Sequence, residues 1–69
     1  METLKQLRKN SKISQEEMAR TLNISLGAYQ LKEKGESELK LSELITLADK
    51  FNMNLTDFIN RIVLFYPKI

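Results

Sequence analysis

The apolar residues of this chain fall into short groups with helical spacing, separated by polar breaks, and residues 14–35 contain two such groups. Ser14 is followed three residues later by Glu17, the capping-box pattern of a helix start, so a helix is predicted to begin at Gln15. Its apolar residues recur on one stripe of a helix with 3.6 residues per turn, which is the face expected to be buried: Met18, Ala19 and Leu22.

A sharp turn and a second short helix are predicted to follow. Asn23 comes directly after the last apolar residue, where a helix often ends in the left-handed conformation that Gly and Asn accept best. Ser25 is a candidate N-cap for a helix over residues 26–34 that stops at Gly35. Two helices joined in this way describe a helix-turn-helix, whose second helix can enter the major groove of DNA. A purely structural pair of helices would show the same spacing, so the spacing alone leaves both interpretations open.

The other apolar groups predict three more helices. A first helix is expected over about residues 2–10, and residues 41–51 carry the strong apolar pattern of a central core helix. A last helix is expected over about residues 57–65, with Thr56 as its N-cap.

The last predicted helix carries an apolar stripe much wider than one packed face. In a monomer this small the surplus would be exposed, and exposed apolar patches often mark association surfaces. We therefore predict a homodimer formed through residues 57–69, unless the first and fourth helices cover the whole stripe. The residues predicted to dimerise are Ile59, Ile62, Val63, Phe65 and Tyr66.

Length and composition narrow the classes of function. The 69 residues make one domain, and the absence of cysteine and histidine removes thiolate and imidazole metal ligands, disulfides and the usual general base. No phosphate-binding glycine loop is evident among two glycines, so we expect neither an enzyme nor a bound metal or cofactor. We also find no signal peptide or membrane-length apolar run, and expect a cytoplasmic protein without a small-molecule substrate.

Charge is distributed unevenly along the chain. Residues 1–35 carry seven basic and four acidic side chains, a net +3, whereas residues 36–69 carry four basic and five acidic side chains, a net −1. The basic half contains the predicted helix-turn-helix, which favours a polyanionic partner. An ordinary solvated surface would also account for this charge.

The outward face of the second helix of this pair is unusually apolar. Gln30 can form a bidentate pair with adenine, and Leu26 and Leu31 can touch thymine methyl groups. Gly27 would permit close approach of the backbone, and Lys34 would suit a phosphate. Alternatively, Leu31 is an ordinary exposed leucine or one that faces a protein partner.

The sequence resembles the phage-repressor and Cro-like helix-turn-helix domains of bacterial and phage transcription regulators. The similarity covers about residues 3–61 and rests on five motifs: Leu-Lys-Gln-Leu-Arg-Lys at 4–9, Ile-Ser-Gln-Glu-Glu-Met-Ala at 13–19, Leu-Asn-Ile-Ser at 22–25, Glu-Lys-Gly at 33–35 and Leu-Ala-Asp-Lys-Phe-Asn-Met-Asn-Leu-Thr-Asp-Phe at 47–58. The resemblance implies an all-α, compact five-helix bundle that binds pseudo-palindromic operator DNA as a dimer.

The resemblance also implies roles for single residues. Gln15 would contact a phosphate at the start of the second helix, and Lys34 would lie near the DNA backbone. The residues of the third helix that would face base edges are Leu26, Gly27, Gln30 and Leu31. Arg8 and Glu33 match a structural ion pair that ties the first helix to the end of the third. The candidate DNA-binding residues are Gln15, Ser25, Leu26, Gly27, Gln30, Leu31 and Lys34.

Three departures from the family pattern bear on function. Polar or basic residues usually stand at positions 26, 27 and 31, and the loop after Gly35 is acidic here where relatives often carry basic residues. Lys32 replaces a residue that is usually apolar, so its stem is expected to cover the core while its ammonium reaches out.

The sequence thus predicts a sequence-specific, repressor-like regulator that binds double-stranded DNA as a homodimer. The alternative is a protein-interaction module on the same fold, such as an anti-repressor, antitoxin-like or adaptor domain, that uses the apolar face of residues 26–31.

Overall fold

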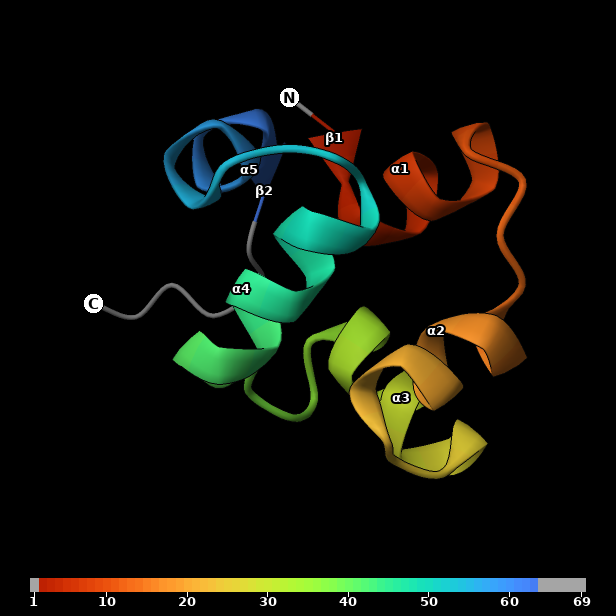
Figure 1. Cartoon of the computed structure of the whole chain (residues 1–69). Coiled ribbons are helices and arrows are strands. Elements are labelled where there is room, and N and C mark those ends of the chain that lie inside the picture. Colours follow the sequence, from red (N-terminus) through yellow and green to blue (C-terminus); the bar gives the residue numbers. More distant parts are fainter. Residues whose placement is uncertain (1, 64–69) are drawn as a thin grey trace.

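The computed structural model describes residues 2–63 of the chain. Within this range lie five α-helices and two short strands, so the predicted all-α, five-helix fold is confirmed (Figure 1). The elements in chain order are β1 (Glu2–Thr3), α1 (Leu4–Asn10), α2 (Gln15–Leu22), α3 (Leu26–Lys34), α4 (Leu41–Lys50), α5 (Leu55–Arg61) and β2 (Ile62–Val63).

The helix-turn-helix of α2 and α3 has the bounds that its capping residues predict. The Ser14 and Ser25 hydroxyl groups each accept a hydrogen bond from the backbone N–H three residues later, at 3.0 and 3.1 Å. Asn23 ends α2 with φ 58° and Gly35 ends α3 with φ 85°, both in the left-handed region. These caps fix the short turn that sets α3 against α2.

Only the Ser14 half of the predicted capping box is present at the start of α2. The Glu17 carboxylate instead accepts a hydrogen bond from Lys50 Nζ at 2.7 Å. Glu17 therefore links α2 to α4 rather than closing its own helix end.

The core gathers one apolar face from each helix around α4, which lies across the middle of the molecule (Figure 1). The residues buried in it are Leu4, Leu7, Met18, Ala19, Tyr29, Leu44, Leu47, Ala48, Phe58 and Ile62. The stripe predicted for α2 thus faces inward, although Leu22 is only partly buried. None of the helices within residues 2–63 has the length and apolar character that crossing a membrane requires.

The first helix begins at Leu4, not at residue 2 as predicted. Thr3 is its N-cap and forms a reciprocal capping box with Gln6, with hydrogen bonds of 3.0 and 3.1 Å. Residues 2–3 instead form β1, which pairs in parallel with β2.

The last helix was predicted over residues 57–65, and this is wrong. It is α5, capped at Asn54 and ending at Arg61, after which the β-branched pair Ile62–Val63 turns extended and forms β2. Ile62 is 1% exposed and belongs to the core of the monomer, so it does not lie on an outward dimerisation stripe. Of the other residues predicted to dimerise, Ile59 is exposed, while Phe65, Tyr66 and the side chain of Val63 lie outside the described part.

Candidate nucleic-acid interface

Helix α3 has a buried side and an exposed side. Tyr29 is fully buried against the core, whereas Leu26, Gly27, Leu31 and Lys34 are exposed. Leu26 and Leu31 are 37% and 43% exposed. The outward face anticipated from the helical wheel is therefore available to a partner.

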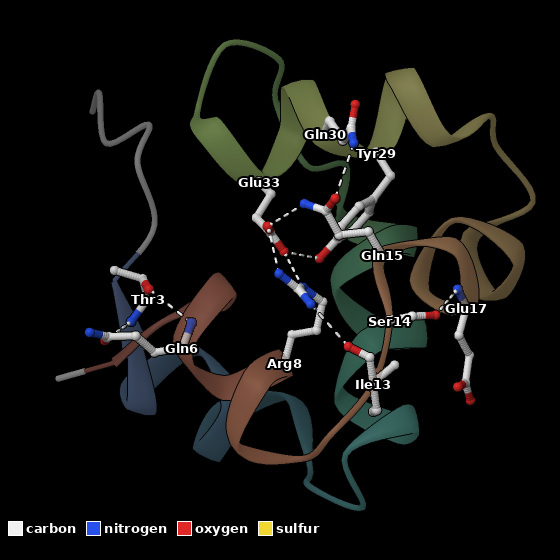
Figure 2. A network of polar contacts seen from close by, with 10 residues as sticks. All are labelled: Thr3, Gln6, Arg8, Ile13, Ser14, Gln15, Glu17, Tyr29, Gln30 and Glu33. Carbon is white, nitrogen blue, oxygen red and sulfur yellow. Dashed lines mark hydrogen bonds and ion pairs between the residues drawn. The ribbon is translucent and has the colours of Figure 1, made fainter.

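The buried side of α3 ends in a network of hydrogen bonds centred on the Glu33 carboxylate (Figure 2). Arg8 donates to both oxygens, from Nε at 2.7 Å and from Nη2 at 3.2 Å. The Tyr29 hydroxyl donates at 2.6 Å, and Gln15 Nε2 donates at 2.8 Å. Since Glu33 is only 5% exposed, these donors replace the water that its charge would otherwise need.

The Arg8–Glu33 ion pair, which the family resemblance implies, fixes α3 relative to α1. The remaining Arg8 nitrogen, Nη1, donates to the Ile13 carbonyl oxygen at 3.0 Å. One guanidinium thus holds α1, the segment before α2 and the end of α3 in a single arrangement.

The electrostatics of this network keep its members in their usual charge states. Burial raises the pKa of the Glu33 carboxyl, but hydrogen bonds from Arg8, Tyr29 and Gln15 outweigh it, and the net pKa is below the ordinary value. The hydrogen bond to Glu33 raises the pKa of Arg8. Burial, followed by the hydrogen bond to Glu33, raises the pKa of Tyr29, which stays a neutral donor.

The network continues from Glu33 to the outward side of α3 through two amide side chains. Gln15, the first residue of α2, donates to Glu33 and accepts a hydrogen bond from Gln30 Nε2 at 3.0 Å. Gln15 and Gln30 were predicted to act separately, one on a phosphate and one on a base. The structure joins them, and it adds the Tyr29 hydroxyl group to the same network.

A polar cleft of about 610 Å³ opens beside these amides. It lies between the start of α1, the start of α2 and the last turns of α3, and carries both ammonium and carboxylate groups. Its lining residues are Thr3, Lys5, Gln15, Gln30, Glu33, Lys34 and Glu36. Lys34 therefore stands at the rim of the surface that contains Gln30.

A protein-family model described as "Helix-turn-helix" matches residues 4–58, from the first residue of α1 into α5. The chain belongs to the helix-turn-helix family. The match includes all of α2, α3 and the Glu33 network, and it supports the Cro and phage-repressor type of domain. The protein is thus a helix-turn-helix DNA-binding regulator. Comparisons with curated proteins and with solved structures gave no match.

The surface charge of this helix-turn-helix regulator is slightly less basic around the DNA-binding motif than the residue counts of its first 35 positions suggest. Arg8 and Lys32 are buried in ion pairs, and Glu33 is consumed in the first of them. The other basic residues of the first 35 are all exposed: Lys5, Lys9, Lys12, Arg20 and Lys34. Glu36 and Glu38 in the loop after α3 are also exposed and oppose this excess.

The position of the Lys32 ammonium group differs from the predicted one. Its Nζ donates to the Glu38 carbonyl oxygen at 2.8 Å and lies 3.2 Å from the Glu43 carboxylate, and the residue is 8% exposed. The ammonium does not reach out to solvent, because the acidic loop and α4 supply oxygen partners inside. Lys32 therefore joins α3 to α4.

Proposed function

We propose that this regulator binds operator DNA as a homodimer and acts as a repressor, with α3 in the major groove. The observation that carries the proposal is the outward face of α3, where half-buried Gln30 adjoins exposed Leu31 and its amide is held by Gln15. A positioned amide on the exposed side of a recognition helix is a group that can read a base edge.

The other side chains of this face supply contacts of a different kind. Leu26 and Leu31 offer apolar contact to thymine methyl groups. Nothing lies within 4 Å of the place where a side chain on Gly27 would begin, so its backbone can come close to the groove. Lys34, at the rim of the cleft, is placed for a phosphate.

Selection of binding sites from a pool of random duplexes tests operator recognition. We expect an enriched site, and an affinity that falls with salt with a log–log slope of about −0.9 per neutralised phosphate. Lys34→Gln should make this slope shallower by about one unit without changing the preferred sequence. Gln30→Ala should relax preference at one base pair and leave the slope unchanged, and Asn60→Ala, which removes an exposed amide on α5, is its control. Absence of an enriched site together with absence of binding at about 50 mM salt would refute the proposal.

The homodimer is proposed to form through the C-terminal part, residues 57–69 of the single domain. Exposed Ile59 on α5 supports this placement, whereas Ile62 is buried in the monomer and does not support it. Sedimentation at rising protein concentration tests it, with Ile59→Lys expected to weaken association. A wild-type protein that remains monomeric at about 100 μM would contradict the dimer.

A second candidate function is favoured by the exposure of Leu26 and Leu31. Two accessible leucines on one helix also suit a groove on another protein, as in an anti-repressor or adaptor. Such binding would depend little on salt, whereas DNA binding would weaken steeply as salt rises.

A further inference from the structure

The charge of Glu33 determines which way the Gln15 amide points. An ionised carboxylate can only accept hydrogen bonds, so the Gln15 atom that faces it at 2.8 Å has to be the donor Nε2. The Gln15 oxygen is then turned toward α3, where it accepts from Gln30 Nε2 at 3.0 Å. Figure 2 shows this chain of bonds from Glu33 through Gln15 to Gln30.

The reversed arrangement is unfavourable at both links. Turning the Gln15 amide over would place its oxygen against a Glu33 oxygen, two acceptors without a proton between them. Turning the Gln30 amide over would likewise place its oxygen against the Gln15 oxygen, which are again two acceptors. The loss is large at Glu33 because this carboxylate is buried and cannot recruit water freely.

The Gln30 amide on the recognition helix therefore has a defined polarity, meaning that its oxygen and its N–H groups each point in one fixed direction. Adenine presents a donor and an acceptor in the major groove, and a glutamine amide matches them with its oxygen and one N–H. An amide free to turn over offers donor and acceptor in either order and can accept A·T or T·A. A fixed amide offers one order only.

We infer that Gln15, held by Glu33, is a positioning residue that sets the polarity of the Gln30 amide and thereby lets the domain distinguish A·T from T·A at one base pair. This inference rests on the proposed operator binding. It gives Gln15 a task in base recognition that does not require Gln15 itself to touch DNA.

The test compares both orientations of the base pair read by Gln30, in otherwise identical duplexes from the selected site. Wild type should prefer one orientation by about fivefold or more, the lower end of what one bidentate pair provides. In Gln15→Ala this ratio should approach one, while preference for A·T and T·A over G·C is retained. Gln30→Ala should lose both preferences, and Asn60→Ala neither. Gln15→Met, which keeps the length of the side chain, provides a second variant if Gln15→Ala folds poorly.

NMR of the free protein tests the hydrogen bonds without DNA. In wild type one side-chain amide proton of Gln30 should exchange slowly with water, and in Gln15→Ala or Gln15→Met both should exchange fast. An unchanged Gln30 amide in the folded variants overturns the inference, and so does an orientation ratio that the variants retain. A wild-type protein with a protected Gln30 amide but no preferred DNA site would overturn operator recognition, and with it the role of Gln15 in base recognition.

Discussion

Replacement of Glu33 by alanine removes the acceptor that holds α1, α2 and α3 together. Four hydrogen bonds end on this carboxylate, from Arg8, Tyr29 and Gln15. The substitution leaves the Arg8 guanidinium in the interior without its counter-charge, since the two side chains are 9% and 4% exposed. Removing one partner of a buried ion pair costs about 3–5 kcal/mol, because the remaining charge is neither paired nor hydrated.

That loss is large compared with the stability of so small a domain. At about 0.05–0.15 kcal/mol per residue, 69 residues give a free energy of unfolding of about 3–10 kcal/mol. Glu33→Ala should therefore lose a third or more of its stability and be partly unfolded at the lower end of this range. Glu33→Gln keeps the shape and one acceptor oxygen, but it also leaves Arg8 without a counter-charge, so its expected loss is about 3 kcal/mol, the lower end of the range for breaking a buried pair.

Urea denaturation followed by far-UV circular dichroism measures these losses. With a denaturant dependence of about 1 kcal/mol/M for a small domain, Glu33→Gln should lower the midpoint by about 3 M. The matched control is Glu17→Gln, which breaks the more exposed pair with Lys50 and should hardly move the midpoint. A Glu33→Ala protein within about 1 kcal/mol of wild type would refute the view that the buried pair fixes α1 to α3.

Three further predictions concern acid stability, the recognition helix and the C-terminal strand. The pKa of Glu33 is lower in the folded protein than its ordinary value of 4.5, so its stabilisation is present above that value and is lost as the pH falls through the folded pKa. Urea midpoints from neutral to acid pH should fall less steeply for Glu33→Gln than for wild type. Gly27→Ala should raise the free energy of unfolding by about 0.5–1 kcal/mol, since the added methyl group has no neighbouring atom within 4 Å. The same methyl group should weaken DNA binding if the backbone at this position approaches the groove. Unchanged DNA binding would argue against such an approach. Ile62→Ala should lose about 2–5 kcal/mol at every protein concentration, whereas a loss confined to high concentration would place Ile62 in a dimer contact.

The ends of α2 and α3 could be predicted because local chemistry sets them. A serine hydroxyl satisfies backbone N–H groups at each start, and Asn23 and Gly35 adopt the left-handed conformation at each end. These preferences act within a few residues and do not depend on the rest of the fold.

The end of the last helix could not be predicted in the same way. Residues 58–66 continue an apolar pattern that fits a helix, and the extended conformation of Ile62 depends on its pairing with Glu2 at the other end of the chain. The adjacent β-branched residues at 62 and 63 were the local sign of a strand, a weak one without knowledge of the partner.

The sequence predicted single residues of the candidate site but not the hydrogen bonds that join them. A helical wheel places Gln30 and Leu31 outward, yet it cannot show that the first residue of α2 reaches Gln30. That contact depends on how α2 crosses α3 and on the carboxylate of Glu33 beneath them. Family resemblance supplied the Arg8–Glu33 pair, and no sequence pattern indicated that Lys32 would turn inward to Glu43.

These connections change how specificity has to be explained. One oriented amide per recognition helix would account for about 1–3 kcal/mol of discrimination between base pairs, and the proposed two-fold dimer would use it twice. In the proposed complex the exposed Leu26 and Leu31 would add apolar contacts to thymine methyl groups but no hydrogen bonds. A preferred site should therefore be short, rich in A·T pairs on each side of its centre, and dependent on dimerisation for useful affinity. Because the exposed lysines and Arg20 supply attraction without sequence preference, raising the salt should improve discrimination relative to total binding.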